Sequence, residues 1–129
     1  MKFIVLSFLF FSTQGFAQQI NEKKEKPILK FKTLEIVRNE IPYDSPEQFV
    51  FEFKNKGKKA VTIQNVSTSC GCTAADKPTE PVKPGKKSKI VVSYDTKRVG
   101  EFTKTITVNS DVAPPVVLTI KGKVKEQGQ

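Results

Sequence analysis

The feature that most constrains the fold is a two-residue alternation of apolar and polar side chains near the C-terminus. From Val116 to Lys125 every second residue is apolar or glycine, and the residues between them are mostly threonine and lysine. Successive side chains of a β-strand point to opposite faces, so this period places one face in a core and the other in water. Phe49–Lys54 and Ile90–Asp95 alternate in the same way, and helical periodicity is absent. The pattern predicts an all-β protein.

Further strands and turns follow the same logic along the chain. The expected strands are Leu29–Val37, Phe49–Lys54, Ala60–Ser69, a short one at Cys72–Asp76, Ile90–Asp95, Phe102–Asn109 and Val116–Lys125. Turn-forming clusters such as Asn55–Lys58 and Lys83–Lys86 separate them. Many short strands with turns between them favour a sandwich over a barrel. We therefore expect a single immunoglobulin-like antiparallel β-sandwich of about seven strands over residues 28–125.

The first residues are typical of a secretory signal peptide over positions 1–17. Lys2 gives a positive start, an apolar run covers Phe3 to Phe11, and Gly15-Phe16-Ala17 offers small residues at a cleavage site. The alternative is an uncleaved anchor, but the run is much shorter than the roughly 20 residues that span a bilayer. We therefore expect a chain that does not span a membrane and is exported to the periplasm or cell envelope, or secreted.

The expected mature chain is strongly basic. The sequence has a formal net charge of +9, and only one of its 22 basic residues lies within the expected signal peptide. Residues 18–27 should form a charged flexible leader, and residues 126–129 a short tail. The lysines are explained either by a solvated surface with protected strand edges or by attraction to an acidic protein or an anionic envelope component. Export argues against nucleic acid as a partner.

The composition removes most catalytic chemistry. The sequence contains no histidine, so neither cysteine has the base that ordinarily converts a thiol into a nucleophile. The acidic residues Asp76, Glu80, Asp95 and Glu101 show no spacing that selects a paired-carboxylate site, and glycine-rich phosphate loops are absent. We therefore expect a protein that is not an enzyme and that has no resident cofactor.

Both cysteines lie in one tripeptide, Cys70-Gly71-Cys72, at the end of an expected core strand. In a regular strand, residues of the same parity, odd or even in number, share one face. Val61 and Ile63 have one parity in that strand, whereas the two cysteines have the other. A bulge near Asn65 would turn both sets toward the core. The two sulfur atoms would then leave the same face, and the glycine between them would let the backbone bend.

A disulfide within this tripeptide would close a very short loop. The loop-entropy model gives such a bond about 1.6 kcal/mol of stabilisation, against about 3 kcal/mol for a loop of fifteen residues. A disulfide in so small a ring is also expected to be strained and easily reduced. This behaviour is more typical of a redox-active pair than of a structural crosslink.

Four interpretations of the pair remain open. The first is structural: two buried thiols or a modest local crosslink. The second is thiol–disulfide exchange, which needs positive charge near a thiolate. Four lysines could supply that charge if they fold back: Lys77, Lys83, Lys86 and Lys87.

The third interpretation is metal binding by Cys70 and Cys72. Zinc would need further ligands, such as Asp76, water or a second chain, so copper(I) fits the two sulfur atoms better. The fourth is an intermolecular disulfide with a partner protein.

A series of motifs then suggests a family. The motifs are Asn55-Lys56-Gly57, Val61–Val66, Ser69-Cys70-Gly71-Cys72-Thr73, Pro84-Gly85, Ile90–Thr96, Gly100–Ile106, Asn109–Asp111 and Leu118–Gly122. The series resembles an exported bacterial family catalogued as domain of unknown function 1573. The resemblance implies an immunoglobulin-like sandwich in the Gram-negative cell envelope, similar to domains of the major-sperm-protein and cilium-associated type. It marks Cys70, Gly71 and Cys72 as signature positions and implies no biochemical role for them.

The sequence therefore predicts an exported, non-enzymatic domain that binds other proteins or envelope components through strand edges or loops. The alternative function is thiol–disulfide exchange or copper(I) binding at Cys70 and Cys72.

Overall fold

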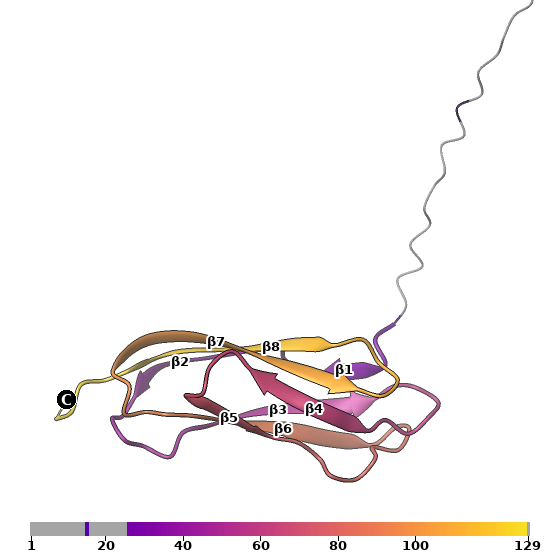
Figure 1. Ribbon diagram of the computed structural model, residues 1–129, viewed down its shortest axis with the longest axis horizontal. Helices are drawn as coiled ribbons and strands as arrows, with labels where there is room; N and C mark the ends of the chain where they lie inside the picture. Colours follow the sequence, from indigo (N-terminus) through magenta and orange to yellow (C-terminus); the bar gives the residue numbers. More distant parts are fainter. Residues whose placement is uncertain (1–14, 16–25, 129) are drawn as a thin grey trace, which may run out of the picture.

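Two β-sheets pack face to face to form the protein (Figure 1). The computed structural model describes residue 15 and residues 26–128, so almost all of the expected signal peptide and leader lie outside the described residues. The strands are β1 (Leu29–Phe31), β2 (Glu35–Ile41), β3 (Gln48–Asn55), β4 (Ile63–Thr68), β5 (Thr73–Asp76), β6 (Lys87–Tyr94), β7 (Gly100–Ser110) and β8 (Val116–Val124). Within the described residues, no helix is long and apolar enough to cross a membrane.

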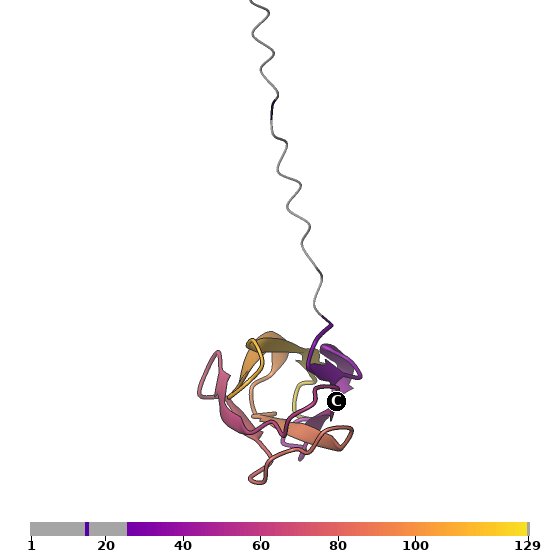
Figure 2. The ribbon, with the colours of Figure 1, turned by 90° about the vertical axis from the view of Figure 1, so that its right-hand side faces the viewer.

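Each sheet contains four strands. Sheet A has the order β1-β3-β6-β5, and sheet B has the order β2-β8-β7-β4. All neighbouring strands are antiparallel except β2, which runs parallel to β8. Viewed along the sandwich in Figure 2, the two sheets lie on opposite sides of a shared interior. The expected all-β immunoglobulin-like sandwich is therefore confirmed.

The expected strand Leu29–Val37 is wrong as a single element. Its first part, β1, pairs with β3 in sheet A, and its last part belongs to β2, which pairs with β8 in sheet B. Between them, the Thr33 hydroxyl donates to the Glu35 carbonyl (2.8 Å) and accepts from the Glu35 N–H (3.3 Å), which turns the chain toward the other sheet. The described sandwich consequently has eight strands and is not wholly antiparallel.

The core is formed by the inward-facing parity of the central strands. Phe49, Phe51 and Phe53 of β3 are buried, and each contributes roughly 1.5–3 kcal/mol relative to an exposed side chain. The ring of Phe102 in β7 meets Phe49 edge-on, with 6.3 Å between centroids, and it stacks on Tyr94 of β6 at 3.9 Å. These aromatic contacts join sheet B to sheet A across the interior.

A buried asparagine organises one end of the sandwich. Asn55, the last residue of β3, is fully buried, and its side-chain amide donates to the carbonyls of Lys59 and Val82, each at 2.8 Å. Its side-chain oxygen accepts from the N–H of Gly57 at 2.9 Å. The side chain therefore holds the turn after β3 against the segment that precedes β6.

We predict that Asn55→Ala lowers the free energy of unfolding by about 2–4 kcal/mol, because two carbonyl groups lose their donor in a buried site. Urea unfolding followed by circular dichroism measures the change. Asn109→Ala, on the outer face of sheet B, is the matched control and should change stability by less than about 0.5 kcal/mol. Equal losses in the two variants would contradict this account of Asn55.

Candidate functional site

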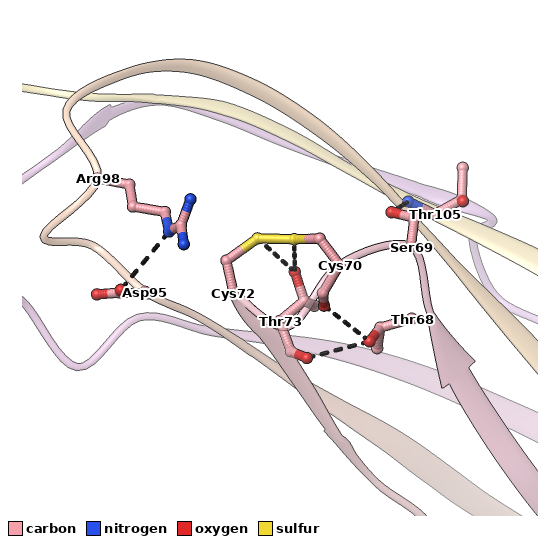
Figure 3. The surroundings of a disulfide bond; sticks show 8 residues. All are labelled: Thr68, Ser69, Cys70, Cys72, Thr73, Asp95, Arg98 and Thr105. Atoms are coloured by element: carbon pink, nitrogen blue, oxygen red, sulfur yellow. Dashed lines mark hydrogen bonds and ion pairs between the residues drawn. A yellow bond between two sulfur atoms is a disulfide. The ribbon is translucent and has the colours of Figure 1, made fainter.

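The Cys70-Gly71-Cys72 motif lies where the chain crosses from sheet B to sheet A (Figure 3). Strand β4, an edge of sheet B, ends at Thr68, and strand β5, an edge of sheet A, begins at Thr73. The residues between them span one side of the sandwich. We call the segment from Ser69 to Cys72 the crossover.

A disulfide joins the two cysteines of the crossover, with 5.4 Å between their Cα atoms. This separation lies in the usual range for disulfides. The predicted bulge is confirmed, because the pairing of β4 with β7 shifts its register between Ile63 and Asn65. Cys72 is 9% exposed, Cys70 is half-buried, and Gly71 is exposed with open space around its Cα. Cys70 is therefore the more accessible of the two cysteines.

Backbone hydrogen bonds hold both ends of the crossover in place. The N–H of Ser69 donates to the carbonyl of Thr105 in sheet B (3.0 Å), and the Ser69 hydroxyl accepts from the Thr105 N–H (3.2 Å). On the side of sheet A, the N–H of Asp95 donates to the carbonyl of Cys72 (2.9 Å). Because these contacts do not involve sulfur, the crossover can keep its position when the disulfide opens.

Two threonine hydroxyl groups line the inner side of the crossover. The Thr68 hydroxyl donates to the carbonyls of Cys70 (3.0 Å) and Thr73 (3.2 Å), as Figure 3 shows. The Thr73 hydroxyl lies 3.9 Å from the sulfur of Cys70 and 3.8 Å from that of Cys72. Disulfide sulfur atoms carry no proton, so here the hydroxyl is the donor, and it would be a stronger donor to a thiolate after reduction.

The charged groups that adjoin the crossover come from the turn between β6 and β7. Asp95, which bonds to Cys72, lies 3.7 Å from Arg98, measured from carboxylate oxygen to Nε. Burial raises the pKa of the neighbouring Tyr94; Arg98 opposes this shift, and Asp95 adds to it. The phenol therefore stays neutral at the pH values where thiols ionise. Asp95 and Arg98 therefore place an anion and a cation, held as an ion pair, beside the crossover (Figure 3).

Lys86 and Lys87, two of the four lysines that could supply positive charge if they folded back, lie away from the motif. Register places Thr73 beside Tyr94 at one end of β6, whereas Lys87 begins the strand at its other end. Arg98 and Asp95 are the charged residues beside the crossover that the sequence did not reveal. No local signal could identify them, because they reach the crossover only through the pairing of β5 with β6.

The metal interpretation depends on the oxidation state of the pair. Two sulfur atoms that are bonded to each other are not thiolate ligands, so Cys70 and Cys72 could hold copper(I) only after reduction. Asp76, the candidate further ligand for zinc, pairs with Val91 at the opposite end of β5 from Thr73. In residue 15 and residues 26–128, no group of three or more histidine, cysteine, aspartate or glutamate side chains is placed to hold a metal ion.

Solved structures show the class of protein. PapD-like domain 7 of human CEP192 has a TM-score of 0.65 and 8% identity, over 80% of this chain and 88% of that chain. A Porphyromonas gingivalis W83 protein of unknown function has a TM-score of 0.61 and 16% identity, over 75% of this chain and 46% of that chain. A chain of the Acinetobacter baumannii CsuC–CsuE chaperone–tip adhesion subunit complex has a TM-score of 0.56 and 11% identity, over 78% of this chain and 58% of that chain. Our chain spans about half the length of the last two. The fold is an immunoglobulin-like sandwich of the PapD-like type.

The family follows from the sequence match. The model of the family described as "Protein of unknown function (DUF1573)" matches residues 29–124, so the chain belongs to this family. The resemblance inferred from the sequence motifs is confirmed. A comparison with curated proteins found no match.

We predict that reduction of the disulfide lowers the free energy of unfolding by about 1.6 kcal/mol or less, because the closed loop is so short. The measurement compares urea unfolding of the chain with and without a phosphine reductant. The variant with both Cys70→Ala and Cys72→Ala is the control, and its free energy of unfolding should be the same with and without the reductant. A loss above about 3 kcal/mol on reduction would mean that the bond is a structural staple.

Proposed function

We propose that the protein is a non-enzymatic, exported binding module without a resident cofactor, and that it holds protein partners by adding their strands to the edges of its sheets. The observation that carries the proposal is the open edge of β2, the longest edge strand among those described, with seven residues. Exposed strand edges present unpaired backbone groups that another chain can pair with.

The geometry of β2 suits such pairing. The Leu34 carbonyl accepts from the Thr119 N–H at 2.9 Å, so alternate residues from Leu34 onward bond to β8. Val37 lies between them and directs its backbone groups away from β8, whereas the backbone groups of Glu35 already bond to the Thr33 hydroxyl. The Val37 side chain is 51% exposed on the outer face, which offers an apolar contact to an added strand.

Two further observations support the proposal. The CsuC–CsuE structure contains a chaperone in complex with a tip adhesion subunit, so a protein of this fold is found in a protein–protein complex. The disulfide is consistent with an oxidising compartment outside the cytoplasm, as the expected signal peptide requires. Periplasmic or cell-envelope localisation is part of the proposal.

The test combines hydrogen–deuterium exchange with two matched variants. Envelope proteins of the source cell should slow the exchange of amides in β2, while peptides from the centre of β3 keep their rate. Val37→Lys should weaken partner capture, because lysine on an edge strand opposes strand addition. Val50→Lys introduces the same charge on the outer face of sheet A, away from β2, and should leave capture unchanged.

The variant with Cys70→Ser and Cys72→Ser should also capture the partner normally. Two results together would contradict the edge-binding proposal. They are loss of the partner by a well-folded cysteine variant and no protection of the β2 amides of the wild type by envelope proteins.

The second candidate function is thiol–disulfide exchange at the crossover. It is favoured by the half-buried Cys70, the short loop that the disulfide closes, and the Thr73 hydroxyl 3.8 Å from the Cys72 sulfur. A partner thiolate would attack the Cys70 sulfur, break the S–S bond and leave Cys72 as the thiolate. The second partner thiol would resolve the mixed disulfide, so the partner loses two electrons and two protons and the crossover gains them.

This candidate predicts that glutathione buffers convert the pair reversibly between a disulfide and two thiols. Alkylation followed by intact-mass measurement counts the thiols, and metal analysis of the reduced sample tests whether copper(I) binds at about one equivalent. The double alanine variant at both cysteines provides the background. A metal-free protein whose disulfide resists glutathione would dismiss both redox and copper functions.

A further inference from the structure

A row of lysines crosses the outer face of sheet A at the end near β1. Lys30 of β1 lies directly opposite Lys54 of β3, and Lys54 lies directly opposite Lys87 of β6. Lys30 and Lys87 are exposed, and Lys54 is half-buried. We call these three residues the lysine row. Facing positions on neighbouring strands bring side chains within about 5 Å at their bases, so three ammonium groups share one stripe of surface.

The row is poorly neutralised by the fold itself. An open groove at the row is lined by five lysines, which include the row, by one acidic residue, Glu52, and by Phe31 and Phe53. The carboxylate of Glu52 lies 3.7 Å from the ammonium group of Lys32, an ion pair outside the row. Like charges directly opposite each other destabilise a sheet. An external anion would relieve this repulsion.

The backbone of β1 offers a second element of the same surface. Lys32 donates to the Glu52 carbonyl (2.9 Å), and Ile28 accepts from the Lys56 N–H (2.7 Å). The even-numbered residues of β1 therefore bond to β3, and Leu29 and Phe31 direct their N–H and C=O groups away from it. Within the part of the chain that the structure describes, β1 is an edge of sheet A, so no described strand pairs with these groups.

An added strand would place its side chains beside Lys30, at the outer end of the lysine row. A segment that pairs with β1 continues sheet A, and every second side chain of that segment lies on the outer face, about 4.8 Å beyond Lys30. Acidic residues at those alternate positions would face ammonium groups, and the residues between them would face inward beside Phe31.

We propose that the edge of β1 and the lysine row bind an extended acidic protein segment by strand addition, with carboxylates at alternate positions. This proposal rests on the proposed function and defines the chemistry of one class of partner. A peptide matches the site better than an anionic lipid, because only a peptide can both supply charge and pair with the free backbone groups of Leu29 and Phe31.

The first arm of the experiment tests the charges. The probe is a fluorescent peptide of alternating glutamate and threonine, and its binding to the full-length chain is measured by polarisation at low salt. The double variant Lys30→Gln with Lys54→Gln removes the two charges of the row nearest the added strand and should bind about tenfold more weakly. Lys123→Gln with Lys125→Gln removes the same charge from the end of sheet B and should bind like the wild type. Equal loss in both variants would overturn the proposal.

The second arm tests the backbone pairing with N-methylated probes. In one probe the threonine nitrogens are methylated, and in the other the glutamate nitrogens are methylated. A strand presents only every second N–H to β1, so one methylated probe should lose binding and the other should keep it. Equal binding of both probes, or equal loss in both, would overturn strand addition.

The third arm tests the membrane alternative with phosphatidylglycerol vesicles. Binding to vesicles that depends on Lys30 and Lys54, without binding to the acidic peptide, would overturn the proposal and assign the row to a lipid surface. Failure at β1 would not be failure of the proposed function, because that function is judged by protection of β2 amides with envelope proteins. Only the protection of β2 amides by envelope proteins tests the proposed function itself.

Discussion

The interior that the two sheets share is the constraint on which the rest of the structure depends. Every strand must present its apolar parity to the same space, so Phe49, Phe51 and Phe53 from sheet A meet residues such as Phe102 from sheet B. The chain can change sheets only where that parity can change. Two of these changes of sheet, at the turn around Thr33 and at the crossover after Thr68, use side-chain hydroxyl groups to fix the backbone.

Much of this architecture could be predicted from the sequence, because alternation reports parity directly. The central strands β3, β6, β7 and β8 and the bulge beside Asn65 follow from it. The division of Leu29–Val37 does not, although Phe31 and Ile36 occupy opposite parities and both pack against the core. Leu34 and Val37 add apolar residues that suggest a single buried strand, yet both are about half exposed. The parallel pairing of β2 depends on a strand far away in the sequence.

The candidate sites also differ in how far they could be predicted, because some of their residues are neighbours in the sequence and others become neighbours only in the fold. The cysteines could be located from sequence because both sit in one tripeptide. Their neighbours Asp95 and Arg98, like the row formed by Lys30, Lys54 and Lys87, become adjacent only through strand pairing. Sheet A also keeps the two sites apart, since β5 after the crossover and β1 beside the row form its opposite edges. A partner on β1 would leave the disulfide accessible.

The parallel pair of β2 and β8 has a consequence for how the molecule forms. Strand β2 begins near the start of the described chain, but its only described neighbour in sheet B is β8, the last strand of the described chain. Sheet B therefore cannot be completed until β8 has emerged, and such non-local pairing slows folding. For a chain with an expected export signal, this delay would keep the polypeptide extended enough to thread through a secretion channel before the sandwich closes on the far side.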